Sequence, residues 1–206
     1  MLISQRFRFV YLANPKTGTT AIERAFTKYA DFKSTNPTAK HMSYREALET
    51  FPVQMEAYEV VVAVRDPLET LHSWYRYRSR DNIKWPNNST QGISFSEFFE
   101  SWTQDKPPHY ARVGTSVDVL LDEHGNVPAD LTVFPYSGEP SLHKYLQRLV
   151  GEKVPDERVN ESPEAPTQFH AELREQVDMA HPKIARAYEI YNSLSYPQVT
   201  SAAASA

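Results

Sequence analysis

The 206-residue chain carries 22 Lys and Arg against 26 Asp and Glu, which gives a formal net charge of −4. A general nucleic-acid-binding protein presents a net basic face to phosphates, so this balance argues against nucleic acid as a partner. It still allows a local basic cleft for one anionic cofactor. The chain has no cysteine, which excludes disulfides, thiolate catalysis and Cys-ligated zinc, and it has no HExxH pattern, so we expect no metal site.

The length fits one domain, which we expect to span residues 1–196, with residues 197–206 as a frayed tail. Residues 1–16 lack the apolar core and small-residue cleavage site of a signal peptide. No run approaches the roughly 18 apolar residues that a membrane-spanning helix needs. We therefore expect a soluble, cytoplasmic protein with no membrane span.

Two segments of the chain read as a buried strand followed by a helix. Residues 7–13 (FRFVYLA) are aromatic and β-branched, and after PKTGTT apolar side chains recur at helical spacing between residues 22 and 29. Residues 60–64 (VVVAV) are continuously apolar, as in a parallel strand that is covered on both faces. Asp66 can then cap a helix and Pro67 suits its first position.

The rest of the chain adds further strands and helices. We expect a polar surface excursion at 81–92, a helix begun by the capping box of Ser94 and Glu97, short strands at 117–121 and 131–134, and helices at 142–149 and 167–194, the last restarted at Pro182. Strands that alternate with helices predict an α/β fold, here a single domain with a mainly parallel central sheet flanked by helices.

The loop Pro15–Thr20 combines residue types that bind phosphate. A loop between a buried strand and a helix amino terminus presents backbone N–H groups to an anion, and Gly18 permits a close approach. Lys16 supplies a positive charge; the hydroxyls come from Thr17, Thr19 and Thr20. An ordinary strand-to-helix turn with a surface lysine explains the same residues. The loop is not a Walker A motif, because the lysine precedes the glycine and the first glycine is missing.

This loop resembles the 5′-phosphosulfate motif of the sulfotransferase family, Pro-Lys-[Ser/Thr]-Gly-Thr-Thr, position for position from Pro15 to Thr20. The resemblance implies a P-loop-like fold and the cofactor 3′-phosphoadenosine 5′-phosphosulfate (PAPS), bound without metal. It implies that Lys16 contacts the bridging or sulfuryl oxygens, while the loop amides with Thr19 and Thr20 hold the 5′-phosphate.

Arg65 and Ser73 form a second candidate phosphate site. Arg65 follows the strand at 60–64, and Ser73 lies about two helical turns further on. The segment resembles the family's 3′-phosphate motif, Arg-[Asn/Asp]-Pro followed by Ser at this spacing. Alternatively, Arg65 pairs with a carboxylate and Ser73 has no role. Three more cations follow on the helix, and we expect them to form either a solvated helix end or a basic rim: Arg76, Arg78 and Arg80.

His41 is the candidate general base, because histidine accepts a proton near neutral pH. Its surroundings, His-Met-Ser-Tyr, resemble the His-x-Ser-Tyr segment of the carbohydrate 2-O-sulfotransferases, whose histidine is implied to act as the base. A histidine at a helix start without a role is the alternative. Glu46 and Glu49 are the fallback bases.

The segment from Arg158 to Ser162 resembles the Asn-x-Ser piece that closes over the cofactor in the same family, so Arg158 and Asn160 are further cofactor candidates. A turn before Pro163 explains the same residues.

Together these motifs predict a sulfotransferase that moves the sulfuryl group of PAPS to a hydroxyl-bearing acceptor, of which a carbohydrate is one candidate, and releases adenosine 3′,5′-bisphosphate. One alternative is a P-loop kinase or related ATP-dependent phosphotransferase. Against it, Lys16 is misplaced for Walker A, and Asp66 is out of register for the magnesium-binding aspartate. The other alternative is a nucleotide-binding module without catalytic activity.

Overall fold

The computed structural model describes residues 1–34, 36–155 and 167–198, and the chain divides into two compact units. Unit 1 comprises Met1–Val64, Leu120–Val159 and Leu194–Ala206, and unit 2 comprises Arg65–Val119 and Asn160–Ser193. The predicted tail at 197–206 lies outside the described residues, apart from its first two positions.

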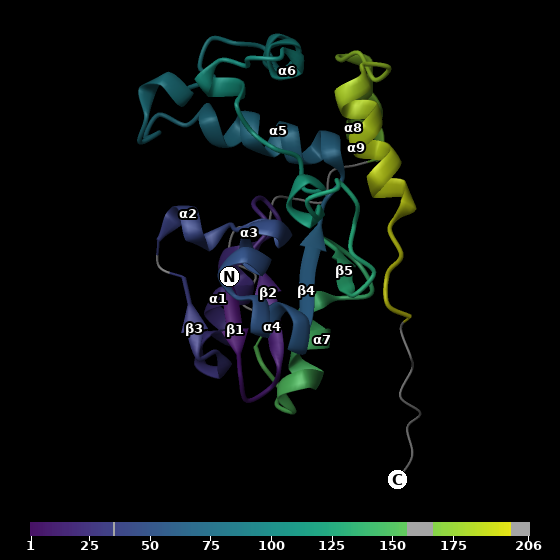
Figure 1. The fold of residues 1–206 in the computed structure, drawn as a ribbon. Coiled ribbons are helices and arrows are strands. Elements are labelled where there is room, and N and C mark those ends of the chain that lie inside the picture. The colour runs from purple at the N-terminus through teal and green to yellow at the C-terminus, as the bar shows by residue number, and fades with distance from the viewer. Residues whose placement is uncertain (35, 156–166, 199–206) are drawn as a thin grey trace. The chain divides into compact units, whose positions relative to one another are not determined.

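Unit 1 is built on one five-stranded sheet in the order β3-β1-β2-β4-β5 (Figure 1). The strands are β1 (Leu2–Ser4), β2 (Phe9–Leu12), β3 (Phe32–Lys33), β4 (Glu59–Val64) and β5 (Leu131–Pro135). Strands β2, β4 and β5 run parallel, whereas β1 pairs antiparallel with both β2 and β3. The predicted α/β fold is therefore confirmed, but the sheet is mixed: its parallel part comprises three strands, and β1 and β3 extend it.

The helices of unit 1 pack aromatic and aliphatic side chains against this sheet. They are α1 (Thr19–Phe26), η1 (Thr27–Tyr29), α2 (Pro37–Lys40), α3 (Tyr44–Thr50), α4 (Pro52–Ala57) and α7 (Leu142–Val150). Phe26 of α1 and Leu146 of α7 join Phe9 and Tyr11 of β2 in one core, and all four are fully buried. Burial of each such side chain contributes about 1.5–3 kcal/mol, so the sheet fixes the helices that flank it.

The carboxyl ends of β2 and β4 lie at the same edge of the sheet, because the two strands are parallel neighbours with Leu12 opposite Val62. The side-chain Nδ2 of Asn14 donates to the carbonyl of Ala63 at 2.9 Å, and this bond ties the chain after β2 to β4. Ligands in α/β folds bind outside this edge. The candidate loop at 15–20 begins there.

Unit 2 is mainly helical. It contains α5 (Pro67–Arg78), η2 (Pro86–Asn88), α6 (Phe95–Thr103), η3 (His109–Ala111), α8 (Thr167–Glu175) and α9 (Pro182–Ser193). The predicted caps are confirmed: Asp66 caps α5, and Ser94 and Glu97 form a capping box at the start of α6. Among the helices of the described residues, none is long and apolar enough to cross a membrane.

The strand predicted at 117–121 is wrong. The chain forms a 3₁₀ turn there, η4 (Asp118–Leu120). The Asp118 carboxylate accepts hydrogen bonds from the backbone N–H and the hydroxyl of Thr115, at 2.6 and 3.1 Å. A side chain that bonds its own neighbouring backbone favours a turn over a strand, and this local bonding outweighs the apolar run.

Arg78 departs from the solvated helix end that we expected for three arginines. Arg76 and Arg80 are exposed, but Arg78 is buried and donates to the carbonyls of His109 and Tyr110, both at 2.8 Å. Burial lowers the pKa of Arg78. The buried guanidinium thus connects the end of α5 to η3 within unit 2.

We expect Arg78→Met to lower the free energy of unfolding by about 1–3 kcal/mol, because two partly buried carbonyls lose a charged donor. Arg76→Met, two positions earlier on the exposed side of the same helix, is the control and should stay within about 0.5 kcal/mol of the unchanged protein. Urea unfolding followed by circular dichroism measures both. Equal stabilities for the two variants would contradict the role given to Arg78.

Candidate functional site

The loop from Pro15 to Thr20 joins β2 to α1 in a left-handed turn. Lys16 and Gly18 both have φ of 69°, a region that glycine adopts without strain. A Cβ on Gly18 would lie 3.5 Å from Tyr136, which is ordinary contact, so the dihedral angle rather than space favours glycine here. Left-handed residues in such loops aim successive N–H groups into a concavity that binds anions.

Hydroxyl groups in this loop have different tasks. The Thr17 hydroxyl donates to the carbonyl of Asn14 at 2.8 Å, so it holds the loop. Thr17 and Thr19 are buried, whereas Gly18 and Thr20 are exposed. The amino terminus of α1 begins after Gly18, and no side chain caps it. The exposed positions and the uncapped helix end are the parts of the loop that fit an incoming phosphate.

His41 lies against the strand that leads into this loop. Its Nδ1 is 2.5 Å from the carbonyl oxygen of Ala13. A carbonyl only accepts, so Nδ1 carries the hydrogen, and in the neutral ring Nε2 keeps its lone pair. Burial lowers the pKa of His41, which favours this neutral form. The ring is therefore held as a proton acceptor at Nε2.

An ion pair holds the residue before His41 to the helix after the loop. The Lys40 ammonium lies 2.7 Å from the carboxylate of Glu23, a buried residue of α1. Together with the Ala13 contact, this pair joins His41 to both the strand and the helix that flank residues 15–20. Unit 1 thus brings the candidate base and the candidate phosphosulfate loop together, although 20 residues lie between Thr20 and His41 in sequence.

The fallback bases occupy different positions. The Glu46 carboxylate accepts from the backbone N–H and the hydroxyl of Ser43 at 2.8 and 2.9 Å, so it serves the capping box of α3. Glu49 is exposed on the same helix. Among the described residues, neither carboxylate makes the contact with Ala13 that His41 makes.

Arg65 and Ser73 belong to unit 2. Arg65 lies just before α5, and Ser73 lies on it. The Nε of Arg65 donates to the carboxylate of Glu69 at 2.9 Å, with both side chains largely buried. The alternative interpretation, in which Arg65 pairs with a carboxylate, therefore describes a contact that the structure contains. Glu69 and Ser73 lie four residues apart on one face of α5, and Arg65, two residues before the helix begins, pairs with Glu69. Glu69 lies between the two predicted 3′-phosphate ligands, and only its spacing from Arg65 hinted at it.

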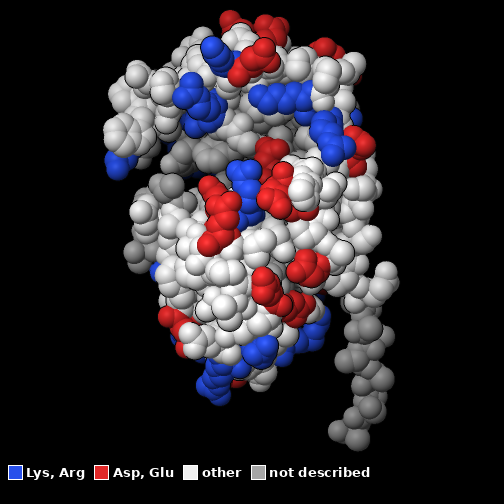
Figure 2. Space-filling view, viewed as in Figure 1, with Lys and Arg blue, Asp and Glu red and all other residues white. Residues whose placement is uncertain are grey.

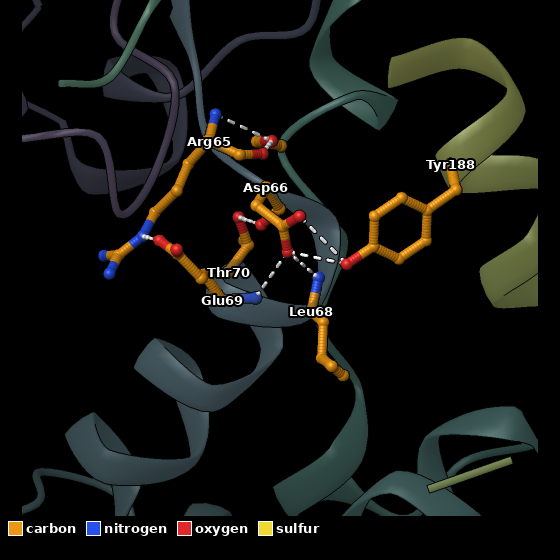
Figure 3. Close-up of polar contacts among 7 residues, drawn as sticks. Arg65, Asp66, Leu68, Glu69, Thr70 and Tyr188 are labelled. Carbon is orange, nitrogen blue, oxygen red and sulfur yellow. Dashed lines mark hydrogen bonds and ion pairs between the residues drawn. The ribbon is translucent and has the colours of Figure 1, made fainter. Parts of the chain in front are cut away.

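Asp66, the cap of α5, receives hydrogen bonds from two elements (Figure 3). One carboxylate oxygen accepts from the backbone N–H of Leu68 and of Glu69, at 2.9 and 3.1 Å. The hydroxyl of Tyr188, from α9, lies 2.8 and 2.9 Å from the two carboxylate oxygens. Burial raises the pKa of Tyr188, so this hydroxyl remains a donor. The carboxylate is therefore committed to holding the start of α5.

Ser116 holds the backbone of Arg65. The N–H of Arg65 donates to the Ser116 hydroxyl at 3.1 Å, and that hydroxyl donates to the Arg65 carbonyl. Sequence reasoning missed both Ser116 and Tyr188, because they lie 51 and 122 residues from their partners.

Two further expectations concern other parts of the chain. Arg158 and Asn160 lie outside the described residues, so their assignment to the cofactor stays a prediction. In the part of the chain that the structure describes, no group of three His, Asp or Glu residues could hold a metal ion. A cavity of about 300 Å³ in unit 2, at α6 and the end of α8, contains none of the predicted site residues.

No family model matches the chain, and comparison with curated proteins and with solved structures finds no similar one.

We expect Tyr188→Phe to lower the free energy of unfolding by about 1.5–3 kcal/mol, the usual cost of a lost hydrogen bond to a charged group. Tyr58→Phe is the control, since the Tyr58 ring stacks on Arg8 without a hydrogen bond from its hydroxyl in the described structure. Chemical unfolding measures both variants. A Tyr188→Phe protein as stable as the Tyr58→Phe protein would show that the α9 contact does not hold Asp66.

Proposed function

We propose that this protein is a PAPS-dependent sulfotransferase that moves the sulfuryl group to an acceptor hydroxyl by in-line displacement. The observation that carries the proposal is the hydrogen bond from His41 Nδ1 to the Ala13 carbonyl. It orients a neutral imidazole beside the strand that leads into the loop matching the phosphosulfate motif. A base and an anion-binding loop side by side are what sulfuryl transfer requires.

The candidate residues of unit 1 have separate tasks in this reaction. Loop amides and Thr20 hold the 5′-phosphate, and the ammonium of Lys16 stabilises the negative charge that builds on the leaving phosphate oxygen. Nε2 of His41 takes the proton of the acceptor hydroxyl as its oxygen bonds to sulfur. The bond between sulfur and the phosphate oxygen breaks, and adenosine 3′,5′-bisphosphate leaves.

The proposal assigns the 3′-phosphate to Arg65 and Ser73. A guanidinium offers several N–H donors, so Arg65 can bond a 3′-phosphate in addition to Glu69. The Glu69 bond and the Ser116 clamp on the backbone reduce the freedom of Arg65 before the ligand arrives. Such preorganisation lowers the entropic cost of binding.

The bonding of Asp66 supports this proposal over a kinase. A phosphotransferase of the P-loop class needs a carboxylate for magnesium after the neighbouring strand. The oxygens of Asp66 already accept from two backbone N–H groups and from Tyr188. Sulfuryl transfer needs no metal, so a carboxylate committed to capping does not hinder it. An inactive nucleotide-binding module, the other alternative, would bind the bisphosphate without transferring sulfate.

We expect adenosine 3′,5′-bisphosphate to bind more tightly than ADP and without magnesium, because the 3′-phosphate meets Arg65 and Ser73. Arg65→Ala should weaken bisphosphate binding about 10- to 150-fold, which corresponds to about 1.5–3 kcal/mol for a charged hydrogen bond. Arg76→Ala, exposed on the same helix, is the control and should bind as the unchanged protein does. Calorimetric titration measures all three, and a preference for magnesium-ADP would favour the kinase.

We expect His41→Ala to lower sulfuryl transfer about 10²- to 10⁴-fold while bisphosphate affinity stays unchanged. Transfer is followed as bisphosphate released from PAPS with a panel of sugars, phenols and simple alcohols. His124→Ala, in an exposed turn, is the control.

The pH profile gives a second readout. The base works only when neutral, so the rate falls as the pH drops through the pKa of His41. Since burial lowers that pKa, half the rate should be lost below the ordinary value of about 6.5. Undiminished transfer by His41→Ala would contradict the assignment, and Glu46→Gln and Glu49→Gln would then identify the base.

A further inference from the structure

The end of α5 and the loop after it, residues 74–91, differ in charge from the rest of the chain. This segment contains four basic residues and one acidic residue, Asp81, in a protein of net charge −4. Arg78 is buried, but the other three cations are exposed: Arg76, Arg80 and Lys84. On the face shown in Figure 2, lysine and arginine side chains lie over the part of the surface that carries α5, with carboxylates beside them.

The same segment exposes two large aromatic side chains. Tyr77 is 41% exposed and Trp85 is 62% exposed, and Val53 of α4 is the other large hydrophobic residue exposed in the described structure. A single exposed hydrophobic residue such as Val53 is ordinary on a protein surface. Two aromatic rings within nine residues, each next to a cation, form a distinct feature.

Contacts along the segment hold rings and cations together. The Arg80 guanidinium lies 5.2 Å from the centre of the Tyr77 ring, and the Lys84 ammonium lies 5.2 Å from that of Trp85. The loop is closed at its base, where the N–H of Thr90 donates to the Arg78 carbonyl at 3.1 Å. The loop, closed at its base, therefore carries Lys84 and Trp85 on the surface of unit 2.

We infer that the 74–91 segment docks this protein on an anionic membrane surface. Indole and phenol rings favour the layer between lipid headgroups and acyl chains, where an apolar ring and a polar edge are both satisfied. Lysine and arginine near an anionic leaflet add attraction, about 1 kcal/mol each, which corresponds to about five-fold in affinity. Docking of this kind is peripheral and does not depend on the proposed sulfuryl transfer.

Other partners fit these residues less well. Protein interfaces are depleted in lysine at their centres, whereas here Lys84 lies over the most exposed ring. Nucleic acid carries the same sign of charge as an anionic bilayer, so soluble polyphosphate is the comparison in the test. An anionic bilayer uses both the exposed rings and the cations.

Co-sedimentation with vesicles tests the inference, using phosphatidylcholine alone and phosphatidylcholine mixed with phosphatidylserine. We expect the full chain to bind the mixed vesicles and not the neutral ones. Arg80→Gln combined with Lys84→Gln should weaken binding about 30-fold, the loss expected for two cations. Trp85→Ala should weaken it as well, and since Trp85 is mostly exposed, unfolding curves should show an intact fold.

Two matched controls lie in unit 1. Lys28→Gln removes a cation that is 65% exposed, and Val53→Ser removes an apolar side chain that is 67% exposed. Both should bind the mixed vesicles as the unchanged protein does. The inference would be overturned by equal binding to neutral and anionic vesicles, or by losses of the same size in the two controls. It would also be overturned if the protein bound soluble polyphosphate more tightly than vesicles and Trp85→Ala left that binding unchanged.

Discussion

The parallel pairing of β2 with β4 is the constraint on which the candidate site of unit 1 depends. It places the carboxyl ends of both strands at one edge of the sheet, where Asn14 can reach the Ala63 carbonyl. That bond fixes the start of the loop that carries Lys16. Because both strands are fully covered, a shift in their pairing would expose or crowd their side chains, so the core sets the position of the loop.

The Ala13 carbonyl performs two functions at that edge. Ala13 lies between β2 and the loop, so its backbone leads the chain into the turn. Its carbonyl oxygen also accepts the hydrogen bond from Nδ1 and so selects the tautomer of His41. Burial opposes charging of the ring, so the same packing that stabilises unit 1 keeps the imidazole in the form that accepts a proton. The proposed chemistry thus uses the environment that folding creates.

Acidic side chains near the start of α5 serve to position other groups. Asp66 bonds the helix terminus and Tyr188, and Glu69 bonds Arg65. Each carboxylate has a defined partner, which makes the region suited to orient a cation for an anionic ligand. At the end of α5, Arg78 is buried and donates to backbone carbonyls of η3, whereas Arg76 on the helix and Arg80 just after it are exposed.

Local sequence determined the elements whose signals lie within a few residues. The capping box of Ser94 and Glu97, the Asp66 cap and the strand at 60–64 were predicted because each depends on bonds between near neighbours or on a short run of apolar residues. The apolar run at 117–121 misled, since the Asp118 turn outweighed it. Tertiary structure alone decided which residues meet across longer separations: His41 with Ala13, Arg78 with the η3 carbonyls and Tyr188 with Asp66. The chemical groups of a side chain determine which bonds it can form, but the packing of the sheet and helices determines which partner comes within reach.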